Sequence, residues 1–230
     1  MEKNTLSETI KERITTAGAR FWAGDNISEF ITDAEKEELI NELTEKFEGV
    51  LQSLIIDTEN DPNSKGTAKR LAKMYINETM SGRYEPAPDA TAFPNDSDSR
   101  YEGMLVVRSE LRSMCSHHHQ PVTGTAYIGI LAAQKLIGLS KYTRIAQWCA
   151  RRGTLQEELC NDIAKEIQAA TGSEDIGIYL RMTHGCCENR GIMAHDSSTT
   201  TTVLRGTFKD DLGTKKEFFD TLSLQTSQLR

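Results

Sequence analysis

The spacing of apolar residues changes near residue 100, and this change limits the fold more than any other feature of the chain. Up to residue 82, apolar side chains recur every three or four positions, for example at Leu6, Ile10 and Ile14. That spacing is typical of amphipathic helices, whereas the alternation over residues 176–182 is typical of a half-buried strand. We therefore expect an N-terminal helical region followed by a part that contains a sheet.

The N-terminal region is predicted to form three helices. The second begins at a cap formed by Thr32 or Asp33 and carries a long apolar stripe over residues 39–54. The third covers residues 67–81 and stops at Gly82.

The stretch 83–100 contains several prolines and a run of asparagine, aspartate and serine, which indicates a linker. We accordingly expect two domains. Residues 1–100 form the helical region with its proline-rich linker, and residues 101–230 form the second domain.

The second part of the chain mixes strands and helices. Strands are predicted at 105–107, 125–130, 176–182 and 199–204, and helices at 140–152 and 155–171. The resulting order is strand, strand, helix, helix, strand, strand, which places the chain in the α+β class.

Two clusters of cysteine and histidine lie near the ends of predicted strands. Residues 115–119 read Cys-Ser-His-His-His, and residues 183–187 read Thr-His-Gly-Cys-Cys. All five histidines of the chain lie in or just after these segments. Thiolate and imidazole are ligands that Zn²⁺ prefers, so the two clusters together predict a metal site. Each cluster alone is equally compatible with buried structural thiols.

Three protein ligands are typical of a catalytic zinc site, because the fourth position then holds water. Cys115 and His118 lie three residues apart, and Cys186 completes the set. His117 and His184 then remain beside the metal as proton-transfer groups. Cys187 is a second candidate for the distant ligand.

Several polar groups indicate an anionic substrate. Cations near a helix N-terminus favour phosphate, although a plain N-cap with solvated basic residues explains the same pattern. The candidate groups are Ser140, Lys141 and Arg144 at one helix start, Arg70 and Lys73 on an earlier helix, and Arg190 after the second cluster. Gln156 and Glu157 begin another helix and offer acceptors for the paired N–H donors of guanine.

The composition excludes other classes of protein. A net charge of −7 argues against a general nucleic-acid binder. No apolar run reaches the ~18 residues of a membrane span, and the N-terminus lacks the apolar core of a signal peptide, so we expect a cytoplasmic protein without a membrane partner. An odd number of cysteines, clustered with histidines, favours metal chemistry in a reducing compartment.

These motifs match one family. In chain order they are Cys-x-His-His, Gly-Leu-Ser-Lys-x-x-Arg, Gln-Glu at a helix start, His-x-Cys-x-x-x-Arg-Gly and a strand rich in serine and threonine. Over roughly residues 33–220 the chain resembles GTP cyclohydrolase I. The resemblance implies a tunnelling fold, in which antiparallel strands of several subunits join into β-barrels, and a homodecamer with active sites between subunits.

The resemblance also implies the reaction. Members convert GTP and water to 7,8-dihydroneopterin triphosphate and formate, the first step of pterin, folate or 7-deazaguanine synthesis. By motif position, zinc would be held by Cys115, His118 and Cys186, protons would be transferred by His117 and His184, guanine would contact Gln156 and Glu157, and the triphosphate would contact Ser140, Lys141, Arg144, Arg190, Arg70 and Lys73.

The chain departs from the family pattern at three positions. Ser116 stands where the family usually has Glu, His119 replaces an aromatic or aliphatic residue, and Met193 replaces a residue that is often basic. We expect an active enzyme, because every ligand and phosphate-contact position is present.

Three alternatives compete with this expectation. The first is a catalytically silent member that binds a nucleotide or a partner. The second is the related nitrile reductase, which uses a cysteine nucleophile with NADPH, and the intact Cys/His/Cys set argues against it. The third is a zinc-dependent base deaminase, whose His-x-Glu and Pro-Cys-x-x-Cys strings are missing from the chain.

Overall fold

The chain divides into two compact units, Met1–Pro86 and Ala87–Arg230. The computed structural model describes residues 4–96, 98 and 100–227. The boundary between the units lies inside the segment expected to be a linker. No helix of the described residues is long and apolar enough to cross a membrane.

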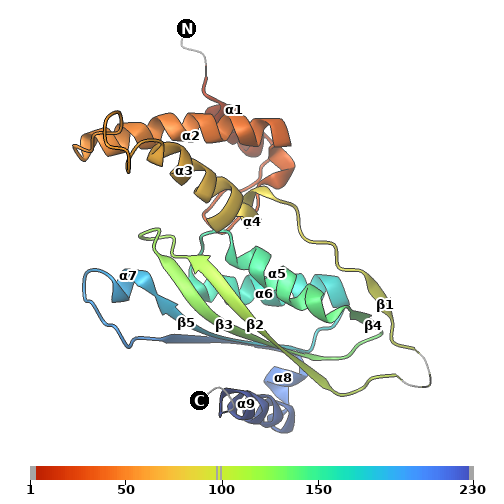
Figure 1. Ribbon diagram of the computed structural model, residues 1–230. Coiled ribbons are helices and arrows are strands. Elements are labelled where there is room, and N and C mark those ends of the chain that lie inside the picture. Colours follow the sequence, from red (N-terminus) through yellow and green to blue (C-terminus); the bar gives the residue numbers. More distant parts are fainter. Residues whose placement is uncertain (1–3, 97, 99, 228–230) are drawn as a thin grey trace. The chain divides into compact units, whose positions relative to one another are not determined.

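In the described residues of the N-terminal unit, every regular element is helical (Figure 1). Thr32, rather than Asp33, caps the longest helix: its hydroxyl accepts from the Glu35 amide, and the Glu35 carboxylate accepts from the Thr32 amide. Val50 and Leu54, at the end of the predicted apolar stripe, are exposed in this unit. Its helical segments are α1 (Leu6–Thr16), a 3-10 turn (Ser28–Phe30), α2 (Asp33–Ser53), α3 (Thr67–Met74), a π-helical turn (Tyr75–Thr79) and α4 (Ser81–Tyr84).

The C-terminal unit is built on an antiparallel sheet in the order β2-β3-β5-β6. Its strands are β2 (Met104–Met114), β3 (Pro121–Leu131), β5 (Ile176–His184) and β6 (Thr199–Arg205). The strands extend those predicted from the sequence. Among the described residues, the outer edges of β2 and β6 have no strand partner.

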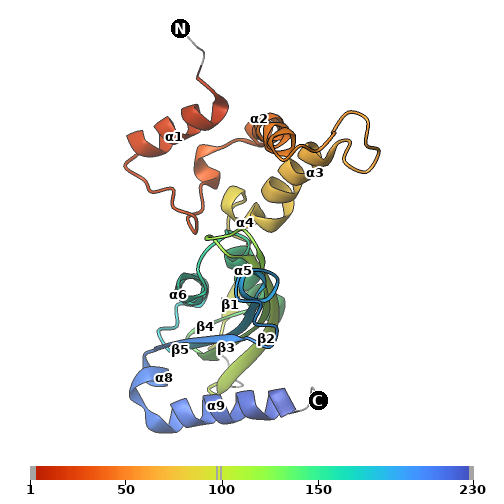
Figure 2. The ribbon, with the colours of Figure 1, turned by 90° about the vertical axis from the view of Figure 1, so that its left-hand side faces the viewer.

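Helices cover both faces of this sheet (Figures 1 and 2). On one face lie α5 (Leu139–Ala150) and α6 (Gln156–Thr171), and on the other lie α8 (Thr207–Asp210) and α9 (Leu212–Ser227). The α6 helix ends at Gly172, as predicted, in a left-handed conformation with φ of 72°. The cap of α5 is Gly138, and Ser140 lies in its first turn.

The two faces of the sheet have different cores. Towards α5 and α6, apolar residues alternate along the strands and are fully buried, as at Ile176, Ile178 and Leu180. Towards α8 and α9, the aromatic rings of Phe208 and Phe218 pack against the sheet. A core on both faces holds the central strands rigidly, which is what a site at their ends requires.

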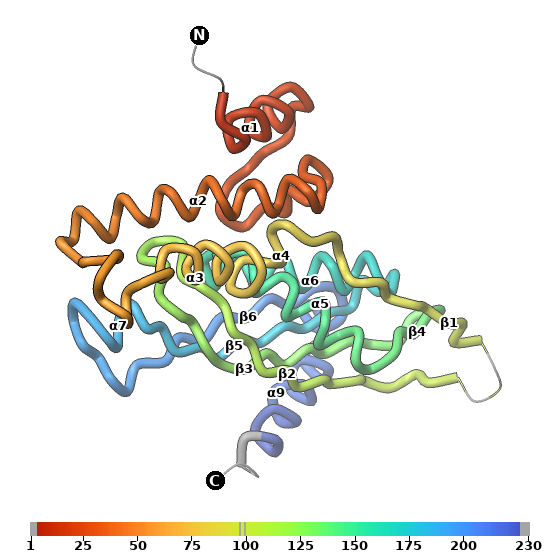
Figure 3. Tube along the Cα trace, turned by 45° about the horizontal axis from the view of Figure 1, so that its top comes forward, coloured from red at the N-terminus to blue at the C-terminus, as the bar shows by residue number. Residues whose placement is uncertain are grey.

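Besides the four-residue helix Gly185–Glu188, two parts of this unit were not predicted from the sequence. The first is a short ribbon in which β1 (Ala92–Pro94) pairs with β4 (Lys135–Ile137), so the expected linker contains a strand (Figure 3). The second is the pair α8 and α9, which follows the last predicted strand.

Candidate metal and substrate site

The predicted metal ligands come together at one end of the sheet. The ligand atoms of Cys115, His118 and Cys186 all lie within 4.8 Å of one another. Cys115 follows β2, His118 lies in the turn between β2 and β3, and Cys186 lies in α7 (Gly185–Glu188), directly after β5. These distances suit three ligands of one ion.

The register of the strands explains this meeting. Strand β3 lies between β2 and β5, and it pairs Pro121 with Met114 on one side and Val122 with His184 on the other. The end of β2 and the end of β5 are therefore held beside the same end of β3. Cys115 and Cys186, which are far apart in the sequence, consequently lie close together in space.

The turn that carries His118 is closed by backbone hydrogen bonds. The Cys115 amide donates to the Gln120 carbonyl over 3.0 Å, and the His119 amide donates to the Cys115 carbonyl over 2.9 Å. His119 takes a positive φ of 50°, which ends the turn and is uncommon for a residue with a side chain. The rings of His117 and His118 lie edge to face, with centroids 6.3 Å apart.

Gly185 lets α7 begin close to the start of β3. A Cβ atom at this position would meet the Pro121 carbonyl oxygen at 2.9 Å. Glycine thus permits the close approach that brings Cys186 beside Cys115.

The sulfur atoms of the site favour a cation. Burial, together with the neighbouring Cys115 and Cys187 thiols, raises the pKa of the Cys186 thiol to about 11. A bound cation reverses this effect, because it stabilises the thiolates that repel one another. The donor set of two sulfurs and one imidazole therefore fits a borderline-soft ion such as zinc.

His184 is held by the amide of Gln156. The His184 Nε2 atom lies 2.8 Å from Gln156 Oε1. The Gln156 amide nitrogen donates to the Thr199 carbonyl over 3.0 Å and to Thr201 Oγ1 over 3.1 Å. Burial lowers the pKa of His184, partly opposed by the charge of Glu157. Gln156 is buried, whereas Glu157 beside it is exposed.

The predicted phosphate contacts lie on two elements and a loop. Ser140, Lys141 and Arg144 occupy the first turns of α5, and Arg190 is exposed after α7. In the described part of the chain, none of these cations forms an ion pair, so they are available to an anion.

Arg70 and Lys73 lie on α3 of the N-terminal unit. The Arg70 guanidinium donates to the Asn63 and Lys65 carbonyls and to the Thr67 hydroxyl. These bonds stabilise the loop before α3.

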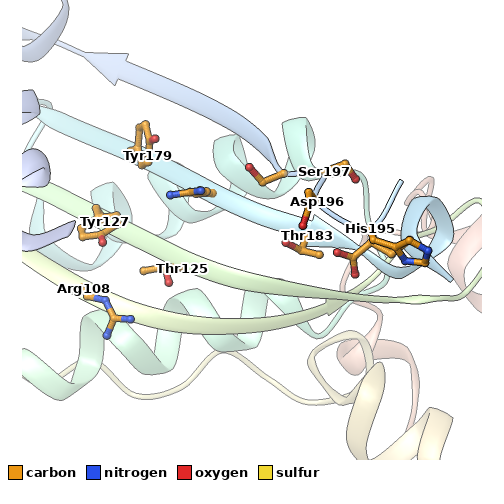
Figure 4. A pocket seen from close by; sticks show the side chains of 11 residues that line it. Arg108, Thr125, Tyr127, Tyr179, Thr183, His195, Asp196 and Ser197 are labelled. Atoms are coloured by element: carbon orange, nitrogen blue, oxygen red, sulfur yellow. The ribbon is translucent and has the colours of Figure 1, made fainter. Parts of the chain in front are cut away.

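A further pocket lies on the sheet face opposite α5 and α6, and none of the three ligands lines it (Figure 4). It has a volume of about 570 Å³, and Arg108 and Arg181 line it together with Tyr127 and Tyr179. Figure 4 shows His195 at the far end of this pocket from Tyr127. These arginines are not among the predicted site residues, although their alternation with buried residues on β2 and β5 marks them as facing away from the main core.

Comparison with known proteins agrees with the site. The model of the family GTP cyclohydrolase I matches residues 43–223. The chain belongs to the GTP cyclohydrolase I family. It is 38% identical over 197 residues to GTP cyclohydrolase 1 of Flavobacterium johnsoniae, covering 85% of this chain and 86% of the relative. It is 38% identical over 180 residues to GTP cyclohydrolase 1 of Aeromonas salmonicida, covering 76% of this chain and 81% of the relative.

This membership confirms the family predicted from the motifs and supports an enzyme of the GTP cyclohydrolase I type. The mixed helical and antiparallel-sheet content of the family agrees with the architecture described above.

Proposed function

We propose that this protein is a zinc-dependent hydrolase that converts GTP and water to 7,8-dihydroneopterin triphosphate and formate. The observation that carries the proposal is the Cys115, His118 and Cys186 cluster at the end of the sheet in a member of this family. Three ligands leave a coordination position open, as catalysis requires.

Zinc, when bound, acts as a Lewis acid and lowers the pKa of a water molecule that it binds to about 7. Cys115, His118 and Cys186 hold the ion. The carbon that leaves as formate is C8 of guanine, which must therefore be placed next to these ligands. We assign Cys186 rather than Cys187 as the third ligand, because its sulfur belongs to the cluster.

Proton transfer is assigned to His117 and His184. Opening of the imidazole ring of guanine requires a proton at N7, and histidine supplies one near neutral pH. Burial lowers the pKa of His184, which favours the neutral ring between turnovers. The ring can then take up a proton and return it within one reaction cycle.

Substrate recognition is assigned to two groups of residues. Guanine recognition is assigned to Gln156 and Glu157, which begin α6, and the exposed Glu157 carboxylate can accept the two parallel N–H groups of guanine. The triphosphate contacts are Ser140, Lys141, Arg144 and Arg190, with Arg70 and Lys73 from the N-terminal unit. Binding energy from the triphosphate then positions a reacting carbon that lies far from it.

We further propose the tunnelling fold and its assembly into multi-subunit β-barrels. The unpaired outer edges of β2 and β6 among the described residues support this, because an antiparallel sheet with two free edges can continue into neighbouring copies. The same proposal includes a homodecamer with active sites between subunits and a catalytic domain over residues 101–230. It also includes a cytoplasmic location and a role at the start of pterin, folate or 7-deazaguanine synthesis.

The deciding experiment incubates the zinc-loaded protein with GTP and measures both formate and the fluorescence of the oxidised pterin. We expect both products, and we expect a Cys186→Ala variant to form neither because it lacks a metal ligand. Formate without pterin would mean that only ring opening occurs. Neither product from correctly assembled wild-type protein would overturn the proposal in favour of a silent binding module.

A further inference from the structure

The hydrogen bonds of Gln156 determine which way its amide points. The Thr199 carbonyl oxygen can only accept, so the Gln156 group 3.0 Å from it must be the NH₂. The amide oxygen therefore faces His184 Nε2, 2.8 Å away. An amide oxygen can only accept, so His184 must carry a proton on Nε2.

This arrangement selects one tautomer of His184. When the ring is neutral, its proton lies on Nε2 and its lone pair lies on Nδ1. No described side chain or backbone group bonds Nδ1. Because Nε2 is engaged by Gln156, Nδ1 is the ring nitrogen left to exchange a proton with a ligand.

The surroundings of Gln156 hold this geometry in place. Its side chain is 4% exposed and makes hydrogen bonds with both its oxygen and its nitrogen. The residue is the first of α6, which packs against β5 and β6, so its amide bridges His184 on β5 and Thr199 on β6. The Thr201 hydroxyl accepts a second hydrogen bond from the same NH₂ group.

We propose that Gln156 is a positioning residue that fixes the tautomer and orientation of His184, so that proton transfer takes place at Nδ1. The inference rests on the proposed function, and it changes the role assigned to Gln156. The oxygen and the nitrogen of the Gln156 amide both form hydrogen bonds within the protein, so they are not free to bind guanine. The exposed Glu157 carboxylate is free to do so.

The kinetic test compares variants of the zinc-loaded full chain. Gln156→Met keeps the length of the side chain and removes its polar groups. We expect it to lower kcat by about 10–100-fold, as for loss of a partner that orients a histidine, with KM for GTP changed less than about threefold. Gln156→Glu restores an acceptor for Nε2–H and is expected to recover part of kcat.

Two further variants serve as controls. Thr201→Val removes one acceptor of the Gln156 NH₂ group but leaves the bond to His184, so kcat should change less than about threefold. Glu157→Gln should raise KM for GTP, because it removes a proposed guanine contact. A rise in KM with unchanged kcat in Gln156→Met would overturn the positioning role.

A spectroscopic measurement tests the tautomer without reference to activity. Nitrogen NMR of ¹⁵N-histidine-labelled protein above neutral pH separates protonated from bare ring nitrogens, and a His184→Gln variant assigns the signal. We expect a proton on Nε2 in the wild type and a mixture of tautomers in Gln156→Met. A proton on Nδ1 in the wild type would overturn the inference even if formate is produced. Absence of formate with the expected tautomer would overturn the proposed function alone.

Discussion

At the scale of single residues, the site contains two kinds of side chain. Some would bind a metal ion, and others hold a neighbouring side chain in place by hydrogen bonds. Cys115, His118 and Cys186 direct their ligand atoms at a common point. Gln156 directs its amide at His184 and at β6. Residue type predicted the first arrangement, because two clusters of thiol and imidazole in one chain together favour a metal site. It did not predict the second, because an amide forms hydrogen bonds with almost any polar neighbour.

The identity of the third ligand can be decided by metal analysis. A Cys186→Ser variant should lose zinc affinity by more than the 10–100-fold typical of an outer-shell partner, because it removes a ligand itself. Cys187→Ser is the matched control and should retain zinc, since the Cys187 sulfur lies outside the cluster of ligand atoms. The opposite result, with zinc lost only from Cys187→Ser, would make Cys187 the ligand.

At the scale of elements, the helices and central strands follow from the apolar pattern, while the packing of α8 and α9 does not. Phe208 and Phe218 reach the sheet because Gly129 and Gly177 carry no side chain there. The β1–β4 ribbon also escaped prediction, since three residues are too few to show a period.

A pair of glycine substitutions tests this packing. In Gly129→Ala the new methyl group would meet the Phe218 ring at 2.7 Å, so we expect destabilisation of about 1–3 kcal/mol from overpacking. Gly49→Ala is the control, because that exposed position in α2 has no atom within 4 Å of the added carbon. It should stabilise the protein by about 0.5–1 kcal/mol through helix propensity. Thermal unfolding of both variants measures the difference, and equal melting temperatures would contradict the close packing.

At the scale of the whole molecule, the proposed assembly links activity to association. If active sites lie between subunits, dilution that dissociates the oligomer should lower the specific activity in parallel with the average mass of the particles in solution. Light scattering and formate release measured over one dilution series check this expectation. Full activity in a species of 25.7 kDa would contradict it, because that is the mass of a single chain.

The sequence by itself identified the family, and it predicted a helical part, a mixed part and the candidate ligands, because each depends on residue type and local spacing. Only the tertiary structure decided which atoms meet. The pairing of β3 with both β2 and β5 brings Cys115 beside Cys186, and the packing of α6 on β6 directs the Gln156 amide at His184. Such contacts arise from strand register and helix packing, which join residues far apart in the chain and leave no local pattern in the sequence.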